Sequence, residues 1–336
     1  MIDAWIQRVA AGQSLSQEEM SAAIDQMMRG AWADEQIAAL LKALAEKGEN
    51  VDELVGAALA MRGHMTAIGS SRDAVIDTCG TGGDSSQTFN ISTAAALVTA
   101  AAGVPVAKHG NRRVTSRTGS ADVLAELGVN IQADLPCVEA CLEELGICFC
   151  FAPLMHGAMQ RVAEVRRRLA MRTIFNMLGP LTNPAGAQFQ LLGIARPHWQ
   201  PRLAEALRRL GTRRALVVHG DDGLDEVTLA AATGIYEATP AGVRQFHWQP
   251  EDFGLERQAL TELEVDGPQS SAGLIRRVLA GEAGAARDIV VANAAAALWT
   301  AGRAQLPRQC AVLAAAAIDN GAAAELLRRL VERTHR

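Results

Sequence analysis

Three glycines and an aspartate follow a short apolar run in the first third of the chain. The stretch DTCGTGGD, from Asp77 to Asp84, places Gly80, Gly82 and Gly83 directly after the apolar residues. Glycine lets a backbone approach a ligand closely, and successive N–H groups in such a loop can hold an anion. The spacing matches neither the P-loop nor the dinucleotide fingerprint G-x-G-x-x-G. Because bare glycine turns are common, the loop alone indicates a phosphate site only weakly.

Polar residues behind this loop strengthen the phosphate hypothesis. Thr88, Asn90, Ser92 and Thr93 lead into the alanine-rich stretch STAAALVTAAAG. A helix N-terminus favours anions through its free N–H groups and its dipole. Either Asn90 or Ser92 could cap the helix alone, and four polar groups are more than a cap needs.

A basic cluster follows the next apolar run. The stretch KHGNRRVTSRTGSAD supplies the polar residues Lys108, His109, Asn111, Arg112, Ser116 and Ser120, with Gly110 as a pivot. Lone basic residues usually lie in solvated loops with a weak surface ion pair, which is the alternative for Lys108 and Arg112.

An acidic cluster, HGDDGLDE, comes later in the chain and contains Asp221, Asp222, Asp225 and Glu226. Neighbouring carboxylates in a glycine-containing loop suit Mg²⁺, which prefers oxygen ligands and often shares them with substrate phosphates. Most acidic loops are merely solvated, so this signal is weak alone. Together, the three clusters indicate a polyphosphate chelated by magnesium.

Short strands and helices must position these clusters. The runs Ala74–Cys79 and Val104–His109 are β-type and are separated by a helical stretch, which is a βαβ rhythm. Further strands are expected at Ile147–Phe151 and Ala215–His219. Ligands of open α/β sheets bind outside the carboxyl ends of strands, so the clusters should face one cleft.

The N-terminal part of the chain has a helical pattern of apolar residues. From Asp3 to about Met65 apolar residues recur at helical spacing, and the pairs Ser16/Glu19 and Asn50/Glu53 match capping boxes. We expect a helical domain over 1–70, joined in space by about 155–186, and an α/β domain over 71–154 and 187–336. The predicted fold class is α/β, with a small N-terminal helical domain and a larger α/β domain whose central mixed, mostly parallel sheet is flanked by helices.

Composition limits the partners of the protein. The net charge of the 336 residues is −5, which offers no overall attraction to nucleic acid or to an anionic membrane. No stretch approaches the roughly 20 uninterrupted apolar residues of a membrane span, and no export signal is seen. We expect a cytoplasmic protein that binds neither nucleic acid nor membrane.

The ordered motifs resemble those of the anthranilate phosphoribosyltransferases. The resemblance is carried by DTCGTGGD, TFNIST, KHGNR, GSADVL, RTIFNMLGPLTNP and VVHGDDGLDE. It implies Mg²⁺-dependent transfer of the 5-phosphoribosyl group of phosphoribosyl pyrophosphate to the amine of anthranilate, giving N-(5-phosphoribosyl)anthranilate and pyrophosphate in tryptophan biosynthesis. It also implies a homodimer and a fold shared with pyrimidine nucleoside phosphorylases.

The resemblance assigns binding roles to matching positions. It implies a phosphoribosyl pyrophosphate site at Gly80, Gly83, Asp84, Thr88, Asn90, Ile91, Ser92, Thr93, Lys108, His109, Gly110, Asn111, Arg112, Ser116 and Ser120. It implies magnesium contacts at Ser92, Asp225 and Glu226. It implies anthranilate contacts at Gly80, Asn111 and Arg166, with His109 lining the same channel. No general acid or base is assigned, because an aromatic amine already has a free lone pair.

A few positions depart from the family pattern. Gly157 and Glu164 stand where the family has proline, and both border the expected anthranilate channel. Thr115 stands where serine is common. These departures concern the shape of the channel more than the reaction.

Other functions compete with this interpretation. A pyrimidine nucleoside phosphorylase-like enzyme would need no paired metal-binding acids, so Asp225 and Glu226 count against it. A non-catalytic nucleic-acid-binding relative would need a basic patch interleaved with aromatic residues, which the sequence lacks. The glycines could also be purely structural.

Overall fold

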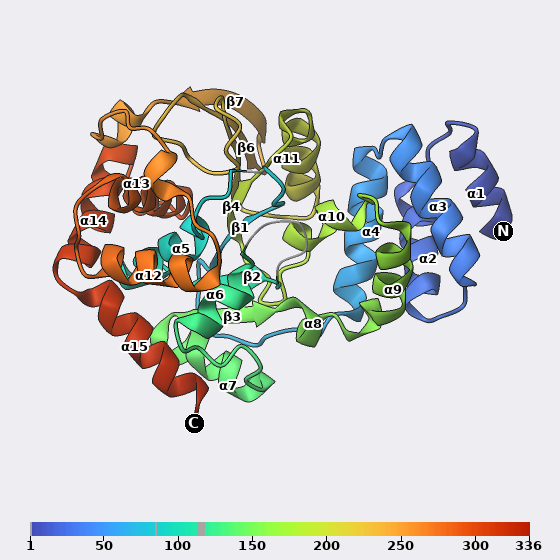
Figure 1. Ribbon diagram of the computed structural model, residues 1–336. Coiled ribbons are helices and arrows are strands. Elements are labelled where there is room, and N and C mark those ends of the chain that lie inside the picture. The colour runs from blue at the N-terminus through green and yellow to red at the C-terminus, as the bar shows by residue number, and fades with distance from the viewer. Residues whose placement is uncertain (1, 85, 113–117) are drawn as a thin grey trace.

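The computed structural model describes residues 2–84, 86–112 and 118–336. A small helical domain lies at one end of the molecule and a larger α/β domain at the other (Figure 1). The N-terminal helices are α1 (Ile2–Ala10), α2 (Gln17–Met28), α3 (Asp34–Lys47) and α4 (Val51–His64).

Capping boxes begin α2 and α4, as the sequence predicted. Ser16 Oγ accepts from the Glu19 N–H at 3.2 Å, and Glu19 accepts in return from the Ser16 N–H at 2.9 Å. Asn50 and Glu53 make the same exchange at 2.9 Å in both directions. Each box satisfies N–H groups that a helix start leaves without a partner inside the helix.

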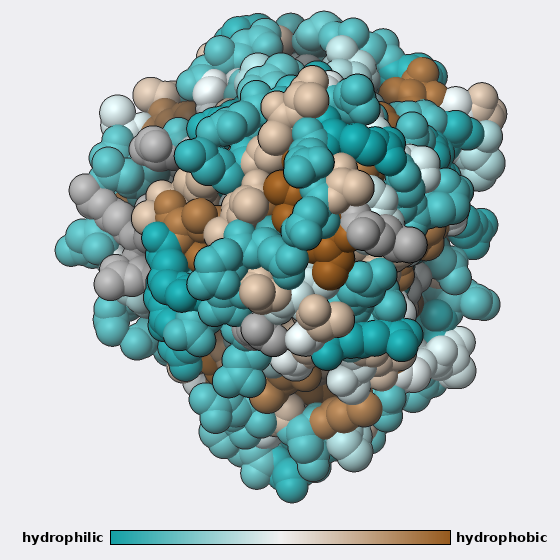
Figure 2. Space-filling model, turned by 90° about the vertical axis from the view of Figure 1, so that its right-hand side faces the viewer, coloured by the Kyte–Doolittle hydropathy of each residue, from teal (hydrophilic) through white to brown (hydrophobic). Residues whose placement is uncertain are grey.

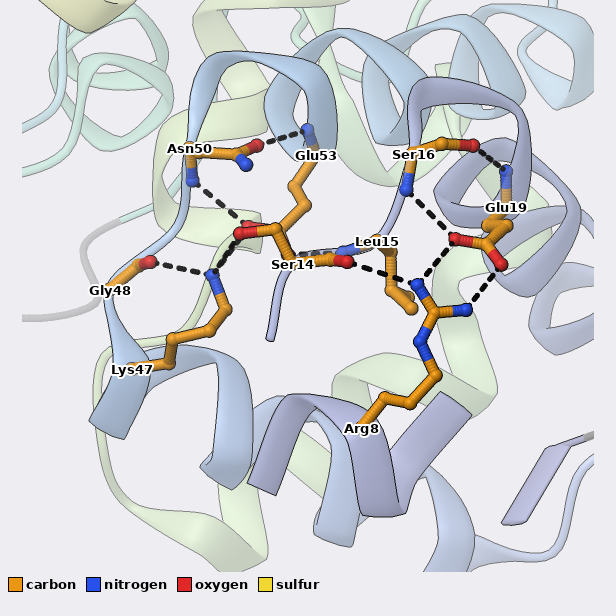
Figure 3. A network of polar contacts seen from close by, with 9 residues as sticks. All are labelled: Arg8, Ser14, Leu15, Ser16, Glu19, Lys47, Gly48, Asn50 and Glu53. Atoms are coloured by element: carbon orange, nitrogen blue, oxygen red, sulfur yellow. Dashed lines mark hydrogen bonds and ion pairs between the residues drawn. The ribbon is translucent and has the colours of Figure 1, made fainter. Parts of the chain in front are cut away.

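A basic side chain joins each box, and the two boxes lie side by side (Figure 3). Arg8 contacts Glu19 at 2.5 Å, and Lys47 Nζ lies 2.9 Å from a Glu53 carboxylate oxygen. The side chains of Lys47 and Glu53 are only 9% and 0% exposed. Glu53 also accepts from the Leu15 N–H at 3.1 Å, so this buried carboxylate joins the α1–α2 loop to α4.

Lys47→Met is expected to lower the free energy of unfolding by about 3 kcal/mol, because it leaves the Glu53 carboxylate buried without its cation. Urea unfolding of the two proteins measures this loss. Lys42→Met is the matched control, since Lys42 pairs with Glu46 on the exposed face of the same helix. That control should change stability by less than about 0.5 kcal/mol. Equal losses in both variants would contradict the role given to the buried pair.

The described residues of the α/β domain form one seven-stranded sheet with the order β3-β2-β1-β4-β5-β6-β7. The first five strands in this order are parallel, and β6 and β7 are antiparallel. The mixed, mostly parallel sheet was predicted. The strands are β1 (Ile76–Gly80), β2 (Val106–Gly110), β3 (Ile147–Phe151), β4 (Phe189–Gly193), β5 (Arg214–Gly220), β6 (Thr233–Thr239) and β7 (Gly242–Trp248).

Strand β4 was not predicted, although it lies at the centre of the sheet between β1 and β5. All five of its residues are buried, so it lacks the polar alternation that reveals a half-buried strand. The sheet therefore has β1 as its switch point, because the chain runs outward to β2 and β3 and then returns to β4 on the other side. Ligands of such sheets bind beyond the carboxyl ends of the strands at this point.

Helices cover both faces of the sheet (Figure 1). The α-helices after β1 are α5 (Ile91–Ala101), α6 (Ser120–Glu126), α7 (Leu135–Ala140), α8 (Ala152–Met155), α9 (Gln160–Leu169), α10 (Phe175–Leu178), α11 (Gln200–Arg209), α12 (Pro268–Leu279), α13 (Ala285–Thr300), α14 (Pro307–Asp319) and α15 (Ala322–Thr334). A π-helical turn spans Cys141–Leu145, and short 3₁₀ turns span Gly157–Met159, Gly179–Leu181, Pro197–Trp199, Pro250–Phe253 and Thr261–Leu263.

Two hydrophobic cores lie on opposite faces of the sheet, within the described part of the chain. Along β5, Leu216 and Val218 belong to the core that includes α5 and α12–α15. Ala215 and Val217 belong to the other core, which includes α11 and the N-terminal helices. Side chains alternate across a strand, so β5 contributes to both cores. The helical domain is thus packed onto one face of the α/β domain.

The segment after β3 returns to the N-terminal helices. Helix α9 packs against α2 and α3, and α10 packs against α4. Figure 1 shows α9 beside the blue helices. The division of the chain into 1–70 with about 155–186, and 71–154 with 187–336, stays a prediction that these contacts favour.

The outer face of the helical domain is mostly hydrophilic, and its apolar patches are small and separate in Figure 2. Among the described residues, no single helix combines the length and hydropathy that a membrane crossing needs. Helices α14 and α15 meet that standard only as a pair bent by 63°.

Candidate active site

A cavity of about 650 Å³ lies at the carboxyl ends of β1, β2 and β5. The glycine-rich, basic and acidic loops all contribute to its wall. The structure thus brings together three clusters that lie far apart in the sequence. The sequence-predicted residues that line it are Gly80, Gly83, Asp84, Thr88, Asn90, Ser92, Lys108, His109, Gly110, Asn111, Arg112, Ser120, Asp225 and Glu226.

Some predicted residues do not line this cavity. The side chains of Ile91 and Thr93 are each only 1% exposed, and their backbone N–H groups donate to Phe89 O and Asn90 O. They are buried because α5 is covered on nearly all of its sides. Ser116 lies outside the described residues.

Close backbone approaches shape the cavity. A Cβ atom at Gly193, the last residue of β4, would lie 1.7 Å from the Asp225 backbone oxygen. Only glycine at that position lets the acidic loop lie against the end of β4. Strand β4, which was not predicted, therefore positions the backbone of Asp225 at the cavity.

Lys108 lines the cavity and is only 3% exposed. Its Nζ donates to Thr78 O and, at 3.2 Å, to Ser92 Oγ. Burial lowers the pKa of Lys108, while the charges of Asp77 and Glu226 oppose that shift. The ammonium group thus links the glycine-rich loop's strand to the start of α5.

Asp84, Asp225 and Glu226 form an acidic group on one side of the cavity. Burial raises the pKa of Asp225 well above its ordinary value, and the charges of Asp84 and Glu226 add to the shift. Burial also raises the pKa of Glu226 to about 7, and its Oε1 accepts from the Ser92 N–H at 3.1 Å. The raised pKa values show that nearby positive groups of the protein do not compensate the burial of these carboxylates.

The donor set fits Mg²⁺ shared with a phosphate ligand. Among the described side chains, no group of three or more His, Cys, Asp or Glu is arranged to hold a metal ion. Mg²⁺ characteristically takes one or two carboxylates, several waters and substrate phosphates. Asp225, Glu226 and the neighbouring Ser92 match the protein's part of such a site.

A second cavity, of about 870 Å³, adjoins the first and is walled by α8, α9 and α10. Gly157 and Glu164, the two positions that depart from the family pattern, both line it. Gly80 lines only the first cavity, although it was expected at both sites. His109 and Asn111 line both cavities and so form the junction between them.

Arg166 presents a half-buried cation to this second cavity. Its Nη2 lies 3.4 Å from Asn176 Oδ1, and its guanidinium lies 5.5 Å from the Phe175 ring centroid. Its buried Nε has no hydrogen-bond partner among the described residues. Burial lowers its pKa, yet an arginine keeps its proton in proteins. A carboxylate is the ligand that would satisfy this group.

His109 is neutral and has a defined tautomer. Its Nδ1 lies 3.0 Å from Gly179 O, and because a carbonyl only accepts, Nδ1 carries the proton. Burial, with repulsion from His156, lowers the pKa of His109 to about 3. The Nε2 lone pair is buried and has no partner in the part of the chain described. A ligand N–H at the junction could satisfy it.

Asp77 and Asn183 hold the junction in place. Asp77 accepts from the His109 N–H at 3.1 Å and from Asn183 Nδ2 at 2.8 Å. Asn183 also donates to Ala107 O at 2.8 Å. The turn GPLTNP is therefore tied to β1 and β2, directly below the wall that the two cavities share.

Sequence reasoning missed several lining residues, notably Arg172, Arg196 and Thr118. Thr118 Oγ1 and Ser271 Oγ both donate to Asn90 Oδ1, at 2.6 and 3.0 Å. Asn90 thus does not cap α5 with its side chain, because its Oδ1 already accepts from these two hydroxyls. The position of Arg172 within the quoted motif RTIFNMLGPLTNP was the available signal for that residue.

Comparison with known proteins decides the family. Residues 4–65 match the "Glycosyl transferase family, helical bundle domain" and residues 72–324 match the "Glycosyl transferase family, a/b domain". An anthranilate phosphoribosyltransferase of Pelotomaculum thermopropionicum is 49% identical over 99% of this chain and 97% of its own length. One of Rhodopirellula baltica is 51% identical over 96% and 94%. The chain belongs to the anthranilate phosphoribosyltransferase family.

Solved structures of anthranilate phosphoribosyltransferases share the whole fold. The enzyme of Thermus thermophilus superposes with a TM-score of 0.93 at 41% identity, covering 99% of both chains. The enzyme of Saccharomyces cerevisiae, solved in complex with PRPP and Mg, gives a TM-score of 0.90 at 25% identity, covering 99% of this chain and 98% of the other. The predicted family and fold are confirmed.

Proposed function

We propose that this protein transfers the 5-phosphoribosyl group of phosphoribosyl pyrophosphate to the amine of anthranilate, releasing pyrophosphate. The observation that carries the proposal is the pair of adjoining cavities that meet at His109 and Asn111. One cavity has the donors and acids that suit a magnesium diphosphate. The other has a half-buried cation that suits a carboxylate.

The first cavity would hold phosphoribosyl pyrophosphate. The glycine-rich loop and the start of α5 offer backbone N–H groups, and Asn90 and Lys108 offer side-chain donors. Asp225, Glu226 and Ser92 would hold Mg²⁺. When bound, Mg²⁺ would neutralise the negative charge that grows on the departing pyrophosphate.

The second cavity would orient anthranilate. Arg166 would bind its carboxylate through a charge-assisted pair of hydrogen bonds. The amine, which is ortho to that carboxylate, would then point to the junction, where His109 Nε2 can accept one of its N–H groups. The nitrogen lone pair is thereby directed at the ribose carbon C1.

Attack on C1 with inversion forms the C–N bond as the C–O bond to pyrophosphate breaks. His109 is a weak base because its pKa is about 3, so it orients the amine and does not remove its proton. The extra proton that the nitrogen carries after attack passes to the departing pyrophosphate or to water. The catalysis is mainly positioning and electrostatic stabilisation of the leaving group. The half-buried acids beside the glycine-rich loop count against a nucleoside phosphorylase, which needs no metal pair.

A fluorescence assay tests the proposal. With purified protein, anthranilate fluorescence should fall after addition of phosphoribosyl pyrophosphate and Mg²⁺, and EDTA should stop the fall. A wild-type protein that leaves the fluorescence unchanged under these conditions would eliminate the proposed function. A homodimer remains a prediction from the family resemblance.

A further inference from the structure

Arg172, on the connection between α9 and α10, reaches into the wall of the phosphate cavity. Its Nη2 donates to Gly82 O at 2.8 Å. A Cβ atom at Gly83, where φ is +86°, would lie 2.3 Å from the same nitrogen. The positive φ already favours glycine at this position, and the guanidinium lies directly against it.

The charge of Arg172 is not balanced by a salt bridge. Nearby, Arg167 pairs with Glu164 at 3.5 Å and Arg168 pairs with Asp34. Among the described residues, Arg172 has no carboxylate oxygen within 4.0 Å. Burial lowers its pKa and the charge of Arg196 adds to that shift, while the charge of Asp225, which is not in contact, opposes it. A half-buried cation without an anionic partner is costly unless a ligand supplies the anion.

Arg172 and Arg166 are alike in this respect and lie six positions apart, but they line different cavities. Helix α9, which carries Arg166, and the connection after it, which carries Arg172, therefore each place one cation without a salt bridge at a different cavity. Guanidinium offers five N–H donors, and Gly82 O takes one of those of Arg172. The remaining donors suit the oxygens of a phosphate.

We propose that Arg172 binds the diphosphate of phosphoribosyl pyrophosphate directly, as a binding residue of the phosphate cavity. This inference rests on the proposed function. It gives the leaving group a contact from the same segment that carries the anthranilate-binding Arg166. The simpler alternative is that Arg172 only holds the glycine-rich loop through Gly82 O.

The two roles are separated by titrating inorganic pyrophosphate, with Mg²⁺ present, into the full-length protein in a calorimeter. Arg172→Gln keeps an N–H donor for Gly82 O but removes the charge and the second arm of the fork. We expect its Kd for pyrophosphate to rise about tenfold or more. Arg172→Lys, which keeps the charge, should lie between that variant and wild type. Arg167→Gln, which removes an exposed arginine of the same segment, is the matched control and should bind as wild type does.

Steady-state kinetics provide a second measurement, which should not change if Arg172 only holds the loop in place. In Arg172→Gln, the KM for phosphoribosyl pyrophosphate should rise while the KM for anthranilate stays within about twofold. Wild-type pyrophosphate affinity in Arg172→Gln, or an equal loss in Arg167→Gln, would overturn the inference. Because pyrophosphate binding needs no turnover, a wild type that binds pyrophosphate but does not consume anthranilate would sink only the proposed function.

Discussion

Replacing Asp225 and Glu226 together by alanine should lower Mg²⁺-dependent turnover about 1,000-fold or more. These acids lie beside the glycine-rich loop, and they are the protein groups that fit a metal shared with pyrophosphate. Without them the departing pyrophosphate would lose the cation that neutralises it. Turnover measured at saturating substrates over a range of Mg²⁺ concentrations tests this result.

The same variant should be at least as stable as wild type. Burial raises the pKa values of both carboxyls, and the charge of Asp84 adds to each shift, which means that the folded protein disfavours their charges. Removing them relieves that cost, so the melting temperature should not fall. Asp221→Ala, at an exposed position of the same loop, is the matched control and should keep wild-type turnover. Wild-type turnover in the double variant would contradict the magnesium assignment.

Arg166→Gln is expected to raise the KM for anthranilate about 100-fold and to leave the KM for phosphoribosyl pyrophosphate nearly unchanged. The guanidinium is half-buried, and its Nε has no partner among the described residues, so a substrate carboxylate would gain a desolvated, bidentate contact. Glutamine cannot supply the charge or the fork. Steady-state kinetics with each substrate varied in turn measure the two constants.

Arg167→Gln is the matched control for this prediction. Arg167 is the next residue on α9, also lines the second cavity, and forms an ion pair with Glu164 at the exposed surface. Its loss should change either KM by less than about threefold, because exposed ion pairs contribute little. A larger effect on the phosphoribosyl pyrophosphate KM than on the anthranilate KM in Arg166→Gln would reverse the assignment of the two cavities.

The helical domain could be predicted because its signals are local. The capping boxes at Ser16 and Asn50 predict where helices begin, because each depends on two residues only three positions apart. The structure shows the reciprocal hydrogen bonds of both boxes. The βαβ order likewise follows from short apolar runs and helical spacing. Parallel strands place their carboxyl ends at one edge, which is why the three polar clusters could be expected to meet.

The features that the sequence did not predict depend on contacts between residues far apart in the chain. Strand β4 is buried on both faces, so its sequence FQLLG lacks the alternation of apolar and polar residues that would indicate a strand. Arg172 looks like a solvated residue of a cationic segment until the fold places it against Gly82. The side chains of Ile91 and Thr93 are buried because α5 is covered on nearly all of its sides, and the part of these residues in the binding site stays a prediction.

The central claim is that two adjoining cavities hold the two substrates on either side of His109 and Asn111. A crystal structure of the protein with Mg²⁺, pyrophosphate and anthranilate tests it most directly, because this combination cannot turn over. The claim predicts pyrophosphate at the glycine-rich loop, with the metal on Asp225 and Glu226, and the anthranilate carboxylate on Arg166. Anthranilate bound in the glycine-loop cavity, or pyrophosphate bound outside it, would contradict the claim.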